Sequence, residues 1–144
     1  MKFLNLTPHD LCIVNGGRSV HLSVDGPAPR LEVLRESLGI LQMENTEVGI
    51  VRSTMGKPLG LPDPQQGIIL IVSALVAEHP AVAHRIDLAY PGEAIRENGK
   101  IVGAHGLCAG PGLASALRGY EIHGGGCMCI GCIDGNAAML GVYV

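Results

Sequence analysis

The sequence predicts an α+β fold: one mainly antiparallel β domain with two short helices, assembled as a homo-oligomer. Short runs in which apolar and polar residues alternate recur along the chain, as in half-buried strands. Turn sequences rich in glycine, proline and asparagine separate these runs, and only two segments combine helix formers with helix boundaries. The chain has 144 residues, the length of one domain, so we expect residues 1–144 to form a single unit.

The composition predicts the oligomer. Apolar residues make up 47% of the chain and charged residues 16%, whereas about a quarter of an ordinary globular chain is charged. A domain of this size has a high ratio of surface to volume. Its charged side chains are too few to cover that surface, and large exposed apolar patches are typical of subunit contacts. We therefore expect a dimer or a larger homo-oligomer.

The N-terminal part of the chain is predicted as short strands joined by turns. Residues 2–6 and 11–14 form two strands on either side of the sequence TPHD. The sequence NGGR at residues 15–18 is a hairpin turn that leads into a third strand at residues 19–24. In that strand the apolar residues alternate with polar ones; they are Val20, Leu22 and Val24.

The middle of the chain is predicted as two more strands and a loop. A turn-rich connection leads into strands at residues 30–34 and 46–55. Three prolines and three glycines then predict an extended loop over residues 56–67. In residues 68–79, β-branched residues give way to helix formers, which predicts a buried strand that passes into a short helix and stops at Pro80.

The C-terminal part has the clearest hairpin signal. Asn98-Gly99 lies between two strand-like runs, so residues 85–107 are predicted as a β-hairpin. Residues 111–119 begin with proline and end with glycine, as a short helix does. Residues 137–144 are predicted as a strand or a buried tail.

Charge and hydropathy exclude several partners. The net charge is −3 and no basic cluster is present, so long nucleic acid is not an expected partner. The longest uncharged apolar run, residues 67–77, is far shorter than the ~20 residues that span a bilayer, so no membrane is expected. The first residues lack the pattern of a signal peptide, which favours the cytoplasm. Five cysteines in that reducing compartment do not predict a disulfide framework.

The segment HGGGCMCIGCIDG, residues 123–135, supplies four groups of the type that zinc prefers. Structural zinc sites usually join two separate pairs of ligands, whereas this segment is one local group. Free cysteine also packs as a small hydrophobic residue. We therefore predict that the segment serves packing, with no cofactor, and a metal site stays open as the alternative. The residues of that alternative site are His123, Cys127, Cys129 and Cys132.

Four arginines lie in or beside apolar segments. An arginine in such a setting needs an anion or a carbonyl partner. Each one alone is explained by a salt bridge or a solvated position, and Asp87 predicts a local ion pair with Arg85. Together with polar residues of the predicted hairpin, they could also ring a pocket for a phosphorylated ligand. The predicted ligand-binding residues are Arg52, Arg85, Arg96, Asn98, His105 and Arg118, and no catalytic residue is predicted.

Residues 5–107 resemble a family of small phage and prophage proteins. The resemblance rests on NLTPHD near the start, on GIVRSTMGKPLGLPDPQQGIILIVSALVA in the middle and on RIDLAYPGEAIRENGKIVG afterwards, and so on L-T-P-H and G-L-P-x-P motifs. The β-rich core with the resemblance is residues 1–107. Residues 108–144, a helix and a tail rich in glycine and cysteine, depart from the short members and are interpreted as an added assembly element.

The chain is also similar to the Thoeris anti-defence sponge proteins. This resemblance implies a non-enzymatic protein that sequesters cyclic ADP-ribose isomers made by bacterial TIR-domain immune enzymes. Some larger assemblies of this kind also hold cyclic oligonucleotides. The resemblance further implies intertwined dimers, ligand pockets shared between subunits and a location in the cytoplasm of the infected bacterial host.

Two alternatives from other classes remain open. The first is a phage structural or assembly protein, which would form large oligomers without a pocket of convergent arginines. The second is a metal protein centred on the Cys-rich tail, which would carry stoichiometric metal. A trap for a cyclic nucleotide differs from both because its ligand is bound tightly and recovered intact.

Overall fold

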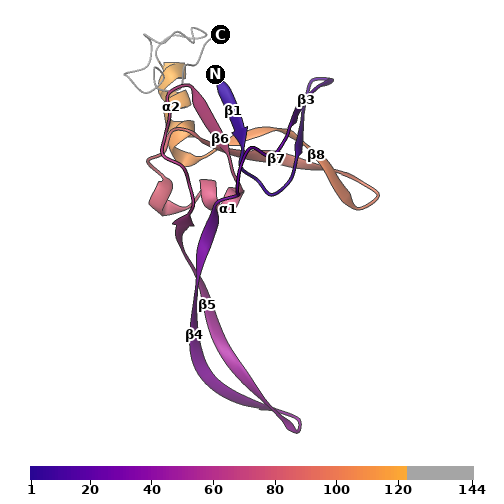
Figure 1. Ribbon diagram of the computed structural model, residues 1–144, viewed down its shortest axis with the longest axis vertical. Coiled ribbons are helices and arrows are strands. Elements are labelled where there is room, and N and C mark those ends of the chain that lie inside the picture. The colour runs from indigo at the N-terminus through magenta and orange to yellow at the C-terminus, as the bar shows by residue number, and fades with distance from the viewer. Residues whose placement is uncertain (123–144) are drawn as a thin grey trace.

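The structure, a computed structural model that describes residues 1–122, is built on a mixed β-sheet from which a long two-stranded arm extends (Figure 1). The arm is a separate antiparallel ribbon of β4 (Arg30–Met43) and β5 (Thr46–Leu59). The α+β class predicted from the sequence is confirmed. The six strands of the sheet lie in the order β1 (Lys2–Asn5), β6 (Ile68–Ile71), β7 (Leu88–Glu97), β8 (Lys100–Ala109), β2 (Leu11–Asn15) and β3 (Arg18–Leu22).

The six-stranded sheet is mixed, although most of its paired residues, like those of the arm, are antiparallel. The pairs β2–β3 and β7–β8 are antiparallel hairpins, as predicted. The pairs β1–β6, β6–β7 and β2–β8 are parallel. Parallel neighbours need long crossover connections. The connection between the parallel neighbours β1 and β6 contains the whole arm. After β3 the chain leaves the sheet, forms the arm and then returns to the sheet as β6.

The turn between β7 and β8 has the geometry that its sequence predicts. Asn98 and Gly99 both have positive φ, 52° and 77°, as a two-residue hairpin turn of type I′ requires. Asparagine and glycine adopt this conformation at the least cost. The hairpin itself is ten residues long on each strand, so it extends well beyond the neighbouring strands (Figure 1).

The core lies on both faces of β6 and the start of β7. Leu70 pairs with Leu88, and both side chains pack on one face in a cluster with Val72 and Val76. Ile69 and Ala89 point to the other face and pack against Leu113 of α2. Because β6 is covered on both faces, its sequence IILI is apolar throughout rather than alternating.

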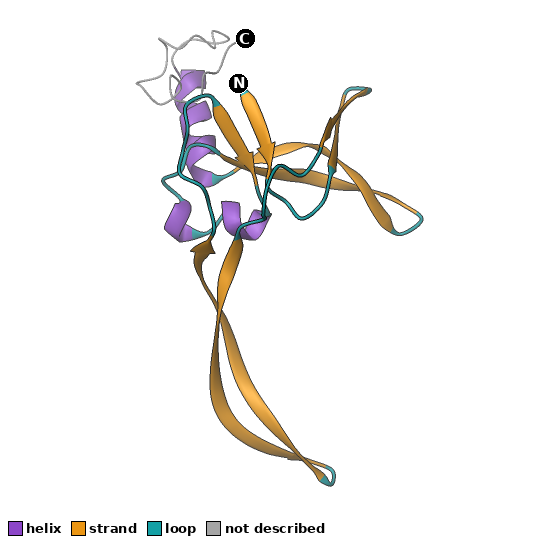
Figure 2. Ribbon diagram, viewed as in Figure 1, coloured by secondary structure: helices purple, strands orange, loops and turns teal. Residues whose placement is uncertain are grey.

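Two helices and one 3₁₀ turn cover the sheet (Figure 2). Helix α1 (Ala74–Ala77) begins after Ser73, whose side chain accepts a hydrogen bond from the Val76 backbone N–H. The 3₁₀ turn η1 (Pro80–Val82) begins at the proline that was predicted to end the preceding helix. Helix α2 (Pro111–Ile122) starts where predicted and is three residues longer than the predicted range of 111–119.

The arm is much longer than the sequence predicts. Its two strands have 14 residues each, whereas strands were expected only at residues 30–34 and 46–55. The predicted loop over residues 56–67 is wrong for its first part, because β5 continues to Leu59. The extra length arises from pairing between the strands, which runs from Arg30 opposite Leu59 to Met43 opposite Thr46. The strand propensities of the individual residues do not predict such pairing, because it depends on contacts between the two strands.

The L-T-P-H motif is a structural loop. Asn5 is fully buried, and its side-chain Nδ2 donates hydrogen bonds to the carbonyls of His9 and Leu22, at 2.9 and 3.0 Å. Its Oδ1 accepts from the backbone N–H and the hydroxyl of Thr7, at 3.0 and 2.7 Å. The Thr7 hydroxyl also lies 2.9 Å from the His9 carbonyl. The loop after β1 is therefore tied to the end of β3 through one asparagine.

Two sequence predictions fall outside the described residues. The strand or buried tail at residues 137–144 is one, and the interpretation of residues 123–135 as packing or a metal site is the other. Within residues 1–122, no helix is long and apolar enough to cross a membrane.

Candidate functional site

The six predicted ligand-binding residues lie in four places in the described chain. Arg52 is on the arm, in β5, and Arg85 follows η1 beneath the proline-rich loop. Three others, Arg96, Asn98 and His105, belong to the β7–β8 hairpin, and Arg118 is on α2. One copy of the chain does not bring all six into one pocket.

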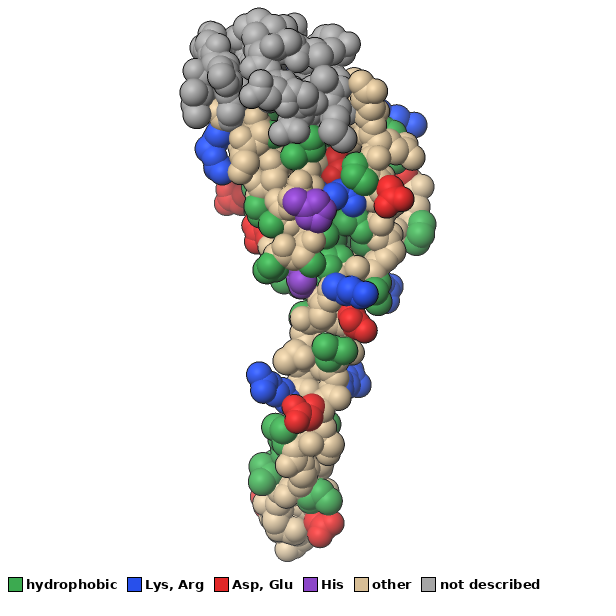
Figure 3. Space-filling model, turned by 90° about the vertical axis from the view of Figure 1, so that its left-hand side faces the viewer, with side chains coloured by type: hydrophobic (Ala, Val, Ile, Leu, Met, Phe, Trp, Pro, Cys, Tyr) green, Lys and Arg blue, Asp and Glu red, His purple; other side chains and the backbone are tan. Residues whose placement is uncertain are grey.

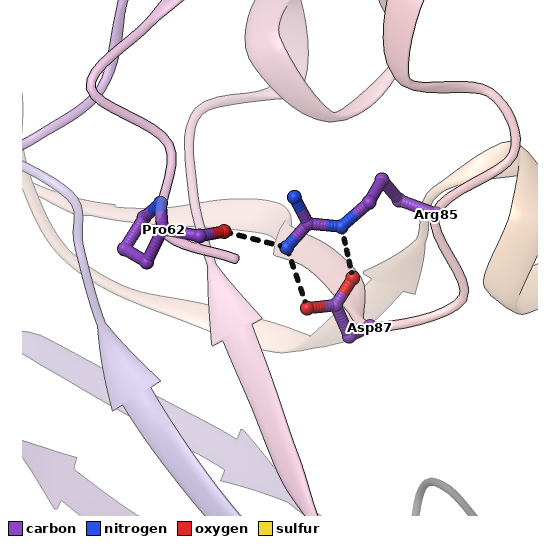
Figure 4. Close-up of polar contacts among 3 residues, drawn as sticks. All are labelled: Pro62, Arg85 and Asp87. Atoms are coloured by element: carbon purple, nitrogen blue, oxygen red, sulfur yellow. Dashed lines mark hydrogen bonds and ion pairs between the residues drawn. The ribbon is translucent and has the colours of Figure 1, made fainter. Parts of the chain in front are cut away.

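Arg85 is held in a buried ion pair (Figure 4). Its Nε and Nη2 donate to the two carboxylate oxygens of Asp87, each at 2.7 Å, and Nη2 also donates to the Pro62 carbonyl at 2.8 Å. Both side chains are almost fully buried. The local ion pair predicted from the sequence is confirmed. It fastens the G-L-P-x-P loop to the segment that enters β7, so Arg85 has a structural role that a ligand would have to disrupt.

The β7–β8 hairpin presents its polar residues to solvent. Asn98 occupies the turn at a positive φ, a backbone conformation that asparagine tolerates, so the turn alone explains why an asparagine is present. His105 lies opposite Glu93, and Arg96 lies opposite Ile101. Because Ile101 and His105 are four residues apart on one strand, Arg96 and His105 are separated by about 13 Å along the hairpin. Each would contact a different part of a ligand, or different ligands.

Arg118 lies on an exposed part of α2. Its Nη2 is 3.4 Å from the hydroxyl of Ser115, one turn earlier in the helix. This weak contact leaves the guanidinium accessible to an anion. In this chain, however, it lies on a different element from every other predicted ligand-binding residue.

Arg52 is part of a polar hollow on the arm. The hollow is lined by residues from both strands, and its volume is about 340 Å³. Glu36 lies directly opposite Arg52 in the ribbon, and Leu34 lies opposite Thr54. Residues directly opposite each other share a face of a ribbon, so these four side chains share one face. The lining residues are Leu34, Arg35, Glu36, Arg52 and Thr54.

Arg35 and Glu36 were missed as candidates. The sequence predicted that the strand ends at residue 34, so both residues were treated as outside the sheet. The missing signal was the pairing of Glu36 with Arg52, which brings residues 16 positions apart into contact range. Among the side chains that the structure describes, the one ion pair is Arg85–Asp87, so Glu36 and Arg52 are cross-strand neighbours that make no ion pair with each other.

Two further polar clusters lie on the sheet. The Tyr90 hydroxyl donates a hydrogen bond to the carboxylate of Glu78, just after α1. This hydrogen bond, together with burial and the negative charge of Glu78, raises the pKa of Tyr90 to about 12. Tyr90 therefore stays protonated and connects β7 to the end of α1. It also lies opposite the free cysteine Cys108.

Cys12 and His21 form the second cluster. They are cross-strand partners in the β2–β3 hairpin, and the Cys12 Sγ lies 3.9 Å from the His21 Nε2. Asp10 lines the same shallow hollow but accepts a hydrogen bond from the Val24 backbone N–H at 2.9 Å. In the part of the chain that the structure describes, no three His, Cys, Asp or Glu side chains gather as metal ligands do.

Comparison of the chain with models of protein families, with curated proteins and with solved structures gives no significant match.

Proposed function

We propose that this protein is a non-enzymatic trap for a cyclic ADP-ribose-type signal in the cytoplasm of an infected bacterial host. By sequestering that signal, and in some assemblies a cyclic oligonucleotide, it blocks bacterial anti-phage defence. The observation that carries the proposal is the polar hollow of the arm, where Arg35, Glu36 and Arg52 line one site. The resemblance of the sequence motifs to phage proteins of this kind supports it further.

The residues of the hollow suit the three chemical parts of such a ligand. Guanidinium groups bind pyrophosphate oxygens through paired, charge-assisted hydrogen bonds, which suits Arg52. A carboxylate accepts hydrogen bonds from ribose hydroxyls, as Glu36 would. The exposed side chain of Leu34 offers an apolar wall for the adenine. Charge and shape together would select a nucleotide over a simple anion.

The hollow is open, and a second subunit would close it. A ribbon of two strands covers a ligand from one side only, whereas a tight small-molecule site buries most of its ligand. The predicted homo-oligomer supplies the missing wall. The proposal thus places the ligand between copies of the chain, in agreement with the pockets shared between subunits that the resemblance implies.

Native mass spectrometry with a panel of cyclic ADP-ribose isomers and cyclic di- and trinucleotides tests the proposal. We expect an oligomer that carries intact nucleotide at a fixed stoichiometry. Arg52→Ala should weaken binding by roughly 10- to 100-fold, because a charge-assisted hydrogen bond contributes about 1.5–3 kcal/mol. Arg18→Ala, an exposed arginine at the start of β3, is the matched control and should bind as the wild type does.

Three outcomes would contradict the trap. Nucleotide that is recovered cleaved would indicate an enzyme. Metal at a fixed ratio without nucleotide would favour the alternative site at His123, Cys127, Cys129 and Cys132. An equal loss of binding in Arg18→Ala would show that the effect is one of net charge rather than of the hollow.

A phage assembly protein is the second candidate, and one observation favours it. Nine of the 16 large apolar side chains that are exposed in the described chain lie on the arm. An arm of this kind suits a protein whose main activity is to join subunits. Large oligomers that bind no member of the nucleotide panel would support this candidate over the trap.

A further inference from the structure

The edge of the six-stranded sheet carries a thiol beside an imidazole. Cys12 of β2 and His21 of β3 lie directly opposite each other, so both side chains share one face of the hairpin. The Cys12 Sγ is 3.9 Å from the His21 Nε2. Strand β3 is the last strand at this edge of the sheet, and the β2–β3 hairpin points away from the arm (Figure 1). The pair is therefore separate from the polar hollow on the arm.

Other described cysteine and histidine side chains have different surroundings. Cys108, the second free cysteine that the structure describes, lies opposite Tyr90 rather than a histidine. The His79 Nδ1 accepts a hydrogen bond from the Ala81 backbone N–H at the start of η1. The histidine side chains visible on the face in Figure 3 occupy separate positions. At the β2–β3 hairpin, by contrast, strand register brings together two of the ligand types that zinc prefers.

The distance between the two atoms fits a bound metal ion. A zinc ion lies about 2.3 Å from a cysteine sulfur and about 2.0–2.1 Å from a histidine nitrogen. At a tetrahedral angle, bonds of these lengths place the sulfur and the nitrogen roughly 3.6 Å apart. The observed separation of 3.9 Å is close to this value. Because the His21 side chain is exposed, a small rotation of its ring can close the gap without movement of the strands.

The pair borders a shallow hollow of about 370 Å³ that also contains a carboxylate. Asp10 lines this hollow, and its Oδ1 accepts the hydrogen bond from the Val24 backbone N–H. The second oxygen of a carboxylate can still bind a cation or a water molecule that the cation holds. In the described conformation the three side chains do not form a complete set of ligands. The hollow instead leaves room for water at the remaining positions of a four-coordinate ion.

We propose that Cys12 and His21 bind one Zn²⁺ ion, with Asp10 beside it and water in the open positions. On binding, the Cys12 thiol loses its proton to solvent and its sulfur forms the bond to zinc, while the neutral His21 ring donates the lone pair of Nε2. The site is formed by two strands of the sheet, so it differs from the alternative site in residues 123–132. The inference goes beyond the proposed function and does not depend on a nucleotide.

A zinc ion at this position would join the edge strand of the sheet to its neighbour. Within the sheet, β3 is hydrogen-bonded to β2 alone. One bond from each strand to the same ion adds a cross-link to this pairing, since the free energy of metal binding also stabilises the folded state. We therefore expect backbone amides of the β2–β3 hairpin to exchange with solvent more slowly when zinc is bound.

The first test titrates the full chain with Zn²⁺ in competition with a chromophoric chelator. The chain carries Cys127→Ser/Cys129→Ser/Cys132→Ser, so that thiols of the tail do not contribute. We expect one ion per chain with a Kd of roughly 1–200 μM, because two or three ligands supply about half of the binding free energy of a four-ligand site. A chain that binds no zinc at millimolar concentration would overturn the proposal.

Variants in the same background identify the ligands. Cys12→Ser and His21→Ala should each weaken binding by at least about 10-fold, since even the loss of a residue that only supports a ligand costs roughly 10- to 100-fold. Cys108→Ser and His84→Ala are the matched controls, because they remove a half-buried thiol and an exposed imidazole at other places. Both controls should bind as their background does. Equal losses in a variant and its control would overturn the assignment.

Nuclear magnetic resonance of the unsubstituted chain locates the ion independently of any variant. Addition of Zn²⁺ should shift the backbone amide signals of β2 and β3 and slow their hydrogen exchange. Shifts confined to residues 123–135 would place the zinc in the tail and overturn the proposal. The spread of the amide signals also shows whether each variant is folded.

These measurements also separate the inference from the proposed function. They use protein without nucleotide, so a failure to bind any nucleotide leaves their outcome unchanged. Zinc that is lost in Cys12→Ser and retained without the tail thiols belongs to the β2–β3 hairpin. If no zinc binds there but nucleotide is still bound intact, the trap survives and the metal site is wrong.

Discussion

Single residues explain why the recognisable motifs of this chain are present. The L-T-P-H sequence surrounds a hydrogen-bond network centred on Asn5, and the G-L-P-x-P loop is fastened by Arg85 through the Pro62 carbonyl. In both cases a buried polar side chain satisfies backbone groups of a loop that has no regular structure. Motifs that look functional in the sequence are here part of the framework.

Replacement of Asn5 tests this interpretation. Asn5→Ala removes a side chain that donates two hydrogen bonds and accepts two more, and leaves their partners unsatisfied. We expect a loss of about 2–4 kcal/mol in the free energy of unfolding, measured by urea denaturation. Asn15→Ala, at an exposed position at the end of β2, should change the stability by less than about 0.5 kcal/mol. Equal losses would show that Asn5 is not the centre of the loop.

The hydrogen bond between Tyr90 and Glu78 predicts a dependence on pH. The pKa of Tyr90 is raised in the folded state to about 12, above its ordinary value of 10. The stabilisation is therefore fully present below pH 10 and is lost as the pH rises towards 12. Glu78→Gln removes the negative acceptor and should lower the pKa of Tyr90.

The wild type and Tyr90→Phe are each titrated by ultraviolet absorbance. The difference between their two curves belongs to Tyr90 alone and gives its pKa. Glu97→Gln, an exposed carboxylate at the end of the same strand, is the control and should leave the titration unchanged. An unshifted curve for Glu78→Gln would show that burial rather than Glu78 sets the pKa.

At the scale of elements, the position of α2 depends on a close backbone approach. A Cβ atom at Gly112 would lie 2.2 Å from the Arg85 carbonyl oxygen and 2.8 Å from that of Ala83. These contacts are with backbone, which cannot rotate away. The first turn of α2 is thus packed directly onto the segment that holds the buried ion pair.

Gly112→Ala should therefore displace the start of α2 despite the better helix propensity of alanine. We expect a loss of at least about 2 kcal/mol in the free energy of unfolding, measured by thermal or urea denaturation. Gly49→Ala is the matched control, because nothing lies within 4 Å of a Cβ at that position. It should be neutral. A neutral Gly112→Ala would show that α2 can shift without cost.

For the whole molecule, stability should depend on protein concentration. If copies of the chain associate through the apolar arm, folding is coupled to association, and the unfolding temperature rises with concentration by mass action. A variant in which residues 36–52 are replaced by a two-residue Asn-Gly turn, between the paired residues Arg35 and Ser53, should lose this dependence. Its sheet should still fold, because no side chain of the two core clusters comes from those residues.

Calorimetry at a series of protein concentrations measures the dependence. Circular dichroism of the shortened variant checks that the sheet is retained. A wild type whose unfolding temperature is constant over the series would contradict coupled association, and an unfolded shortened variant would show that the arm contributes to the core.

The sequence by itself determined the local features of this protein. The hairpins, the turn at Asn98-Gly99, the start of α2 and the Arg85–Asp87 pair were all predicted, because each depends on residues close together in the chain. The α+β class follows from the same local patterns.

Only the tertiary structure decided which strands are neighbours. The placement of β6 between β1 and β7, the full length of the arm and the pairing of Glu36 with Arg52 depend on contacts between distant residues. The six predicted ligand-binding residues were distributed over four places for the same reason. Alternation reports which side of a strand is buried, but partner choice is set by long-range packing, which a local pattern does not contain.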